Sequence, residues 1–176
     1  GETEHMVEEG QNGSILIDNE TGRIIAFVGG IDYDKNNFNN ATQMRRSPAS
    51  AIKPLSVYGH ALELGIITPA SMVYDGPIRI DIPGVPTPYE PKNATGFSNR
   101  WWNAREALEN SQNIPAVRIF SEMYAEHDLT PFFRNSGIGP DAIPDQDFAN
   151  LSLALGGVTQ GTTVEELSGA YAAIAN

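Results

Sequence analysis

Arg45-Arg46-Ser47-Pro48-Ala49-Ser50-Ala51-Ile52-Lys53-Pro54-Leu55 places Ser50 three residues before Lys53 at the expected start of a helix. Residues i and i+3 of a helix share one face, with Cβ atoms about 5–6 Å apart, so a hydroxyl and an amine can meet there. Proline is tolerated near a first turn, which suits Pro54, whereas Pro48 blocks helix upstream. The helix dipole and free N–H groups at such a start favour the negative charge of a developing oxyanion.

The Ser50–Lys53 spacing predicts nucleophilic catalysis. Serine is a poor nucleophile at neutral pH and needs a neighbouring base. Lys53 can be that base only if burial or a nearby cation lowers its pKa from about 10.4. The S-x-x-K pattern alone is weak evidence, because a capping serine beside a solvated lysine also produces it. The assignment therefore depends on residues further along the chain.

Length and composition fit one globular domain with its own core. The chain has 176 residues, of which 40% are hydrophobic and 19% charged. A net charge of −11 argues against a nucleic-acid surface. The absence of cysteine excludes disulfides and cysteine–zinc chemistry, and no apolar run reaches the ~18 residues of a membrane span. We expect neither a metal nor an organic cofactor.

The two ends suggest a piece of a longer polypeptide. Residues 1–12 are acidic at first and loosely patterned, so we expect an interdomain linker or the edge of a cut fragment. The last residues, Tyr171–Asn176, end in or just after a helix without a closing strand. We therefore expect residues 13–176 to be the N-terminal part of a domain.

Two apolar, β-branched runs predict an antiparallel hairpin near the N-terminus. Gly13–Asp18 and Arg23–Gly30 flank Asn19–Gly22, a turn in which glycine is available for positive φ. Both runs are almost continuously apolar, which favours inner strands covered on both faces.

The rest of the chain is mainly helical in pattern. Apolar spacing predicts a helix over Ser50–Leu64 with Gly65 as its C-terminal cap, and Thr163 with Glu166 forms a capping box before a final helix. Residues 75–100 contain five prolines and are expected to be irregular, with a short strand at most over Ile78–Ile82. Further helices are expected over residues 103–109, after Asn113 with Pro115 in the first turn, and over 129–135.

Ser111-Gln112-Asn113 forms an S-x-N sequence between two expected helices. A hydroxyl and an amide on one exposed turn can hydrogen-bond a substrate amide and a neighbouring ammonium. Helix capping by Ser111 or Asn110 is the simpler explanation of these residues alone. However, S-x-x-K followed by an S-x-N sequence resembles the first two motifs of penicillin-binding proteins and class A β-lactamases, in the same order.

Longer segments resemble the transpeptidase domain of class A penicillin-binding proteins, the bifunctional peptidoglycan synthases. Phe38–Gln43 leading to Ser50–Pro54 resembles the region of their nucleophile, and Ala107–Val117 resembles their second motif. Leu153–Gly161 and Glu166–Asn176 resemble the segment that precedes their third motif. The resemblance runs from about residue 13 to residue 176.

The resemblance implies a role for four residues. Ser50 would attack the carbonyl between two D-alanines of a peptidoglycan stem peptide, and β-lactams would acylate it as mimics. Lys53 would take the Ser50 proton, Ser111 would relay a proton to the leaving amine, and Asn113 would hold Lys53 and the substrate amide. Gln112 occupies the variable middle position and receives no chemistry.

The resemblance also implies an α+β fold of the penicillin-binding transpeptidase and serine β-lactamase type, an antiparallel sheet flanked by helices, present here as an incomplete fragment. The expected activity is serine D,D-transpeptidation at the extracytoplasmic face of the bacterial membrane, in a membrane-anchored parent protein. A β-lactamase, a D,D-carboxypeptidase and a non-catalytic β-lactam-binding or structural fragment are the alternatives. The expected partners are stem peptides and β-lactams.

Two features depart from the family pattern. The third motif, K-[ST]-G, is missing: Lys92-Asn93-Ala94-Thr95-Gly96 has the wrong spacing and place, so we expect that motif beyond Asn176. The remainder of the domain could then act as a partner in the form of a separate chain. Trp101-Trp102 is bulkier than expected, and packing of a loop explains it better than a substrate contact.

Other chemistry has little support. The histidines stand apart, at His5, His60 and His127. They form no H-x-x-x-H or H-E-x-x-H pair, and His60 should be an ordinary packed or surface imidazole. Asp141, Asp145 and Asp147 lack the glycine and terminal glutamate of a calcium-binding loop, so we expect a solvated acidic turn.

Overall fold

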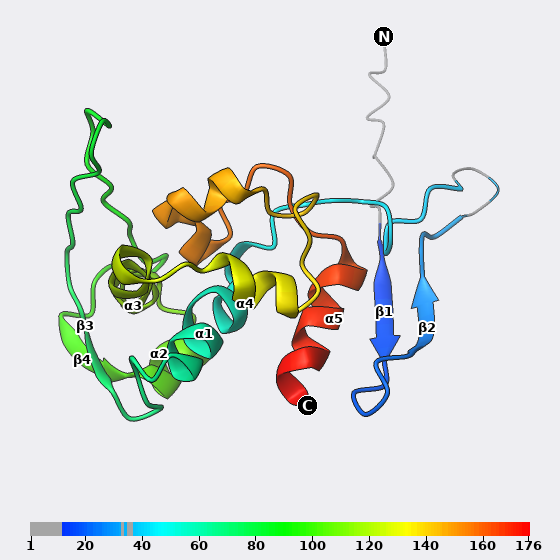
Figure 1. Ribbon diagram of the computed structural model, residues 1–176, viewed down its shortest axis with the longest axis horizontal. Coiled ribbons are helices and arrows are strands. Elements are labelled where there is room, and N and C mark those ends of the chain that lie inside the picture. Colours follow the sequence, from blue (N-terminus) through cyan, green and yellow to red (C-terminus); the bar gives the residue numbers. More distant parts are fainter. Residues whose placement is uncertain (1–11, 33, 35–36) are drawn as a thin grey trace, which may run out of the picture.

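The computed structural model describes residues 12–32, 34 and 37–176 and has an α+β fold, as expected (Figure 1). The expected linker at residues 1–12 lies almost wholly outside the described residues. The strands are β1 Ser14–Ile17, β2 Ile24–Val28, β3 Met72–Asp75 and β4 Arg100–Asn103. The helical elements are η1 Ala49–Ile52, η2 Pro54–Gly59, α1 His60–Glu63, α2 Ala104–Glu109, α3 Asn113–Glu126, α4 Thr130–Asn135, η3 Asp145–Ala149, η4 Leu151–Leu155 and α5 Val164–Ala175.

The N-terminal hairpin forms as predicted, with β1 antiparallel to β2. Its turn is stabilised by Asp18, whose carboxylate accepts hydrogen bonds from the Glu20 N–H at 3.1 Å and from the Thr21 hydroxyl at 2.6 Å. Gly22 adopts φ +68°, a conformation that costs glycine little. The turn chemistry read from the sequence therefore produces the observed hairpin.

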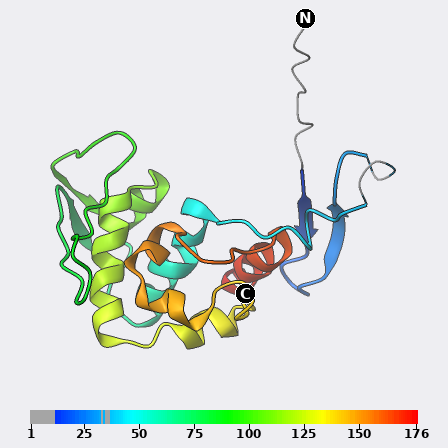
Figure 2. The same cartoon turned by 90° about the horizontal axis from the view of Figure 1, so that it is seen from above.

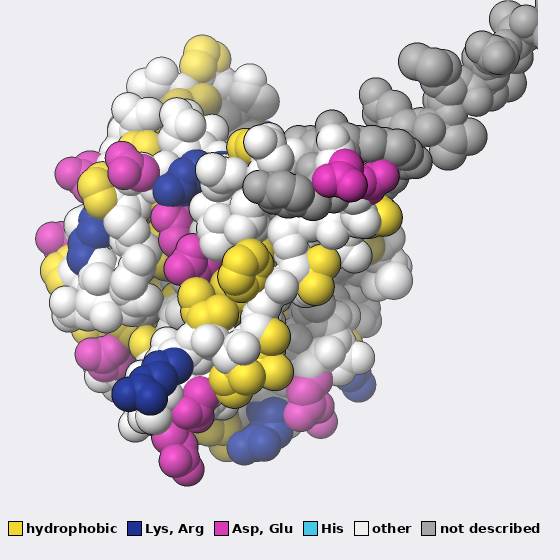
Figure 3. Space-filling model, turned by 90° about the vertical axis from the view of Figure 1, so that its right-hand side faces the viewer, with side chains coloured by type: hydrophobic (Ala, Val, Ile, Leu, Met, Phe, Trp, Pro, Cys, Tyr) yellow, Lys and Arg dark blue, Asp and Glu magenta, His cyan; other side chains and the backbone are white. Residues whose placement is uncertain are grey.

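The prediction that both strands are covered on both faces is wrong for the described chain. Helix α5 lies beside β1 on the side of the helical body, and β2 lies farther out (Figures 1 and 2). Large apolar side chains of the hairpin are therefore more than 40% exposed, namely Leu16, Ile24, Ile25, Phe27 and Val28. Figure 3 views this side of the molecule, where apolar side chains gather among acidic and basic ones.

The core lies in the helical body and is centred on α3. Its buried residues include Ile114, Val117 and Phe120, which follow helical spacing, and Pro115 stands in the first turn as expected. This face packs against β3, η2 and η4. Burying such side chains contributes roughly 1.5–3 kcal/mol each, so α3 is the element that holds the body together.

The helix expected over Ser50–Leu64 is one continuous helical path with three geometries. It begins with the 3₁₀ turn η1, continues as the π-helical η2 and ends as the α-helical α1. Pro54 opens η2 and has no N–H to donate, so the regular i→i−4 ladder cannot pass through it. Gly65 follows the end of the helix with φ +71°, which confirms the predicted cap.

The β3–β4 sheet was not predicted. Its register pairs Met72 with Asn103 and Val73 with Trp102, and the irregular segment between the strands makes an isolated bridge at Ile80 and Tyr89. Trp102 is 8% exposed and belongs to the core, as loop packing would require, whereas its neighbour Trp101 is 61% exposed.

The expectation of a solvated acidic turn is wrong for Asp147. Its carboxylate is buried and accepts hydrogen bonds from the Thr159 N–H at 2.8 Å and the Thr159 hydroxyl at 2.5 Å. Asp145 is exposed and forms an ion pair with Arg134 at 2.7 Å. His60 is buried and stacks on Phe132 with ring centroids 4.5 Å apart, so it is a packed imidazole.

Candidate active site

The segment before Ser50 is tied to the C-terminal part of the chain. The Arg45 guanidinium pairs with both oxygens of the Glu166 carboxylate at 2.6 and 2.7 Å. Arg46 forms an antiparallel bridge with Thr162, and Glu166 also completes the predicted capping box with Thr163. A bidentate Arg–carboxylate pair specifies geometry as well as energy. These contacts set where η1 begins.

A close backbone approach then fixes the residue before the serine. Ala49 has φ +47°, a left-handed conformation that costs a residue with a side chain roughly 1–2 kcal/mol. Gly156 packs against it so tightly that an added Cβ would lie 2.5 Å from the Ala49 nitrogen and oxygen. The Ser47 hydroxyl donates to the Gly156 carbonyl at 2.6 Å and locks the approach. Ser50 follows directly and is exposed.

Lys53 points away from solvent into the turn that holds the second motif. Its side chain is completely buried. Its Nζ donates to the Ser111 carbonyl at 2.7 Å and to Asn113 Oδ1 at 2.7 Å. Longer contacts reach the Ser111 hydroxyl at 3.2 Å and the Gln112 carbonyl at 3.4 Å. Lys53, Ser111 and Asn113 therefore lie together, as the sequence led us to expect.

Burial lowers the pKa of Lys53 to about 8. At pH 7 such an amine is neutral in about a tenth of molecules, far more than a solvated lysine. The acceptors around it are carbonyl, amide and hydroxyl oxygens rather than carboxylates. The site therefore satisfies the hydrogen-bonding capacity of the amine without the negative charge that would hold its proton.

Ser50 stands one turn before Lys53 but makes no hydrogen bond with it in the described part of the chain. Every hydrogen bond of Lys53 Nζ goes to residues 111–113. Ser111 is exposed and has φ +50°, and its carbonyl receives one of the two shortest of these bonds. Both serines are therefore exposed at strained backbone, since Ser50 follows the left-handed Ala49 and Ser111 is itself left-handed. Such strain recurs at functional sites.

The N-terminus of α3 has a support that the sequence analysis missed. Gln112, at the N-cap position, makes no capping bond with its side chain. Instead, Asn93 Oδ1 accepts from the N–H groups of Asn113 and Ile114 at 2.8 and 3.1 Å. The Lys92 carbonyl accepts from Asn113 Nδ2 at 2.8 Å. The segment rejected as a third motif thus supports the second one.

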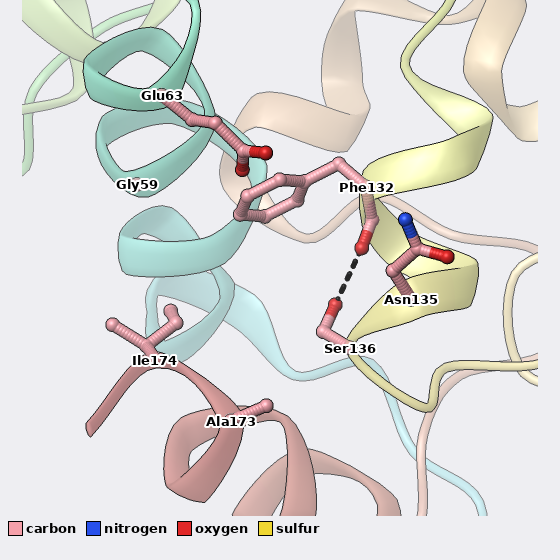
Figure 4. Close-up of a pocket in the computed structure, with 7 residues that line it drawn as sticks. All are labelled: Gly59, Glu63, Phe132, Asn135, Ser136, Ala173 and Ile174. Atoms are coloured by element: carbon pink, nitrogen blue, oxygen red, sulfur yellow. Dashed lines mark hydrogen bonds between the residues drawn. The ribbon is translucent and has the colours of Figure 1, made fainter. Parts of the chain in front are cut away.

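A separate pocket contains none of these residues. It has a volume of about 310 Å³ and lies between Gly59 and Glu63, helix α4 and the last turns of α5 (Figure 4). Its wall includes the ring of Phe132, whose carbonyl accepts a hydrogen bond from the Ser136 hydroxyl. The candidate site is instead the surface around Ser50 and Ser111.

Comparison with known proteins assigns this arrangement to a family. Residues 13–176 match the model of the penicillin binding protein transpeptidase domain. The chain belongs to this family. It is 35% identical over 170 residues to penicillin-binding protein 1A of Neisseria lactamica and 33% identical over 171 residues to penicillin-binding protein 1A of Pseudomonas aeruginosa. These alignments cover 94% and 97% of the chain, respectively.

A solved structure supports the same fold. The crystal structure of penicillin-binding protein 1A from Haemophilus influenzae superposes with a TM-score of 0.79 at 35% identity, over 92% of this chain and 23% of that one. The chain spans about a fifth of the length of the curated relatives named above. Within its described residues, no helix has both the length and the apolar character required to cross a bilayer.

Proposed function

We propose that this chain carries the nucleophile of a serine D,D-transpeptidase that cross-links peptidoglycan stem peptides, and that penicillin acylates it at Ser50. The observation that carries the proposal is Lys53. It is completely buried, its pKa is lowered to about 8, and it donates to Ser111 and Asn113 one helical turn from an exposed serine. Nucleophile, base and proton relay are thus within one small region.

The mechanism has two half-reactions, acylation of Ser50 and transfer of the acyl group to a second amine. Ser50 Oγ bonds to the carbonyl carbon between two D-alanines while neutral Lys53 accepts the Ser50 proton. The C–N bond then breaks and Ser111 relays a proton to the departing amine, so D-alanine leaves and an ester remains on Ser50. The amine of a second stem peptide attacks this ester and loses a proton, which Lys53 passes to Ser50 Oγ as the ester C–O bond breaks and the new peptide bond forms. Asn113 orients Lys53 and the substrate amide.

The proposal includes parts outside these 176 residues. A K-[ST]-G segment would supply a second oxyanion-hole N–H and a hydroxyl for the substrate carboxylate. We place the working enzyme at the extracytoplasmic face of the bacterial membrane, anchored by its parent protein, where stem peptides are found. Family membership supports both statements.

Labelling of the complete domain with a fluorescent penicillin tests the function, with mass spectrometry to locate the adduct. We expect a stable ester on Ser50, and a cross-linked product when stem peptide and an amine acceptor are supplied. Rapid turnover of the penicillin would indicate a β-lactamase. Release of D-alanine without cross-linking would indicate a carboxypeptidase. No adduct would indicate a non-catalytic module.

A further inference from the structure

Asn93 uses the whole capacity of its side-chain amide. Its Nδ2 donates to Asp75 Oδ1 at 2.7 Å and to the Gly96 carbonyl at 3.0 Å. Its Oδ1 accepts the N–H groups of Asn113 and Ile114. An amide offers two donors and two acceptor sites, so nothing is left over. Exchanging Oδ1 and Nδ2 by rotating the amide would place Oδ1 against the oxygens of Asp75 and Gly96 and Nδ2 against two N–H groups. The hydrogen bonds therefore fix its orientation.

Asp75 anchors this amide from the end of β3. It is completely buried, and its Oδ2 accepts the Ser98 N–H at 3.0 Å and the Ser98 hydroxyl at 2.6 Å. Ser98 in turn accepts a hydrogen bond from Trp102 Nε1 at 2.9 Å. Burial raises the pKa of Asp75, but the hydrogen bonds from Ser98, Asn93 and Trp102 outweigh it and hold the pKa below its ordinary value. Asp75 is therefore a charged acceptor at neutral pH.

Two neighbouring residues of this network, Lys92 and Asn93, hydrogen-bond to Asn113. Asn93 holds the Asn113 main chain, and the Lys92 carbonyl holds its side-chain nitrogen. With Nδ2 committed to Lys92, the amide must present Oδ1 to Lys53, where it accepts at 2.7 Å. The orientation of Asn113, and with it the position of the Lys53 amine, follows from contacts made by the irregular segment 76–99.

We propose that Asp75 and Asn93 are positioning residues of the active site, which act through Asn113 to hold Lys53 beside Ser50 and Ser111. Given the proposed function, on which this inference rests, neither residue touches substrate. Their role is to keep the start of α3 and the Asn113 amide in one arrangement. Misplacement of a reacting group by about 1 Å can cost ~100-fold in rate, so loss of the network should slow acylation.

Isosteric substitutions in the complete domain test the proposal by the rate of Ser50 acylation with penicillin. Asp75→Asn leaves only one acceptor oxygen for two groups of donors, so its amide nitrogen must face either the Asn93 nitrogen or the Ser98 N–H. Asn93→Asp sets two carboxylates against each other. We expect each to lower the rate by about 10- to 100-fold. The double variant Asp75→Asn/Asn93→Asp restores a donor–acceptor pair with reversed polarity. It should therefore acylate about tenfold faster than Asn93→Asp alone, a non-additive result.

Asp147→Asn is the matched control, because Asp147 is also a buried carboxylate that accepts from one backbone N–H and one hydroxyl. It makes no hydrogen bond with Lys53, Ser111 or Asn113 in the described structure. Its melting temperature should fall, but its acylation rate should stay within about twofold of the parent at temperatures where the protein is folded. Ser98→Ala is a milder substitute if Asp75→Asn does not fold.

The outcomes distinguish failure of the positioning role from failure of the proposed transpeptidase function. If the parent domain is labelled at Ser50 and Asp75→Asn or Ser98→Ala acylates at the parent rate, the positioning role is wrong and the function stands. The positioning role is also wrong if Asp75→Asn and Asp147→Asn lower the melting temperature equally and slow acylation equally. A parent domain that is never labelled overturns the proposed function and this inference with it.

Discussion

Asn113 Oδ1 accepts a 2.7 Å hydrogen bond from Lys53 Nζ, across sixty residues of sequence. The bond joins the first motif to the second inside a buried site, where the amine has a pKa of about 8. A neutral amide is suited to this task. It satisfies the ammonium form by hydrogen bonding, yet it lacks the charge with which a carboxylate would raise the pKa of Lys53. The pair therefore positions a lysine that can still lose its proton.

The nucleophile is tested by Ser50→Ala in the complete domain. We expect covalent penicillin labelling to disappear, because Lys53 and Ser111 would have no hydroxyl to activate. Ser47→Ala is the control, since Ser47 has no lysine three residues later. That variant should still be labelled, although more slowly, because it loses the bond to Gly156. Covalent uptake by Ser50→Ala would show that another residue is the nucleophile.

The base is tested by Lys53→Arg. A guanidinium keeps the positive charge but stays protonated in proteins, so it cannot accept the Ser50 proton. If Lys53 is the base, the acylation rate should fall by roughly 10²–10⁴-fold, the range typical of general acid–base catalysis. Stopped-flow measurement with a chromogenic β-lactam gives this rate. A near-normal rate would mean that Lys53 contributes only charge.

The acylation rate should rise with pH, because the reaction requires the neutral amine of Lys53. Burial lowers the pKa of Lys53 to about 8, and only the deprotonated form accepts a proton from Ser50. The rate should therefore rise with pH up to a midpoint near 8 and fall by about tenfold per pH unit well below it. Rates between pH 6 and 10 measure this. A midpoint near 10.4, as in a solvated lysine, would contradict the buried site.

Local patterns were sufficient for much of the fold and pointed to the four candidate residues. The hairpin, the cap at Gly65 and the Thr163–Glu166 capping box depend on residues close in sequence, and each appears in the structure. The start of α3 with Pro115 in its first turn was predictable for the same reason. Two short motifs singled out Ser50, Lys53, Ser111 and Asn113, and the resemblance of the longer segments around them implied their roles.

The features that were missed depend on long-range contacts. The β3–β4 sheet joins Met72 to Asn103 across a proline-rich segment, and the short strand expected within it at Ile78–Ile82 is only an isolated bridge at Ile80. Asn93 supports α3 from twenty residues away. Helical spacing also cannot distinguish the π geometry of η2 from α geometry. Coverage of the hairpin was overestimated because an apolar run does not say what covers it.

The approach of Gly156 to Ala49 can be tested with two glycines of similar backbone. Gly156 and Gly137 have φ +86° and +87°, but an added Cβ meets nothing within 4 Å at Gly137. Gly137→Ala should lower the free energy of unfolding only by the cost of a left-handed alanine, about 1–2 kcal/mol. Gly156→Ala should cost a further ~1–3 kcal/mol from overpacking and should also slow acylation at Ser50. Equal losses in both variants, measured by urea unfolding and penicillin labelling, would mean that the contact does not position the serine.

The exposed hairpin predicts how the 176 residues behave when they are expressed alone. Ile25 and Phe27 of β2 are 63% and 56% exposed, and within the described residues the only strand paired with β2 is β1. An apolar strand with an unpaired edge is a template for pairing with another chain. We expect sedimentation velocity at micromolar concentration to detect dimers or larger species, and Ile25→Lys/Phe27→Lys to shift the protein toward monomer. Val85→Lys, at a 49% exposed position in the segment between β3 and β4, is the control and should leave association unchanged. A parent chain that is already monomeric, or a Val85→Lys chain that dissociates equally, would exclude the hairpin as the contact.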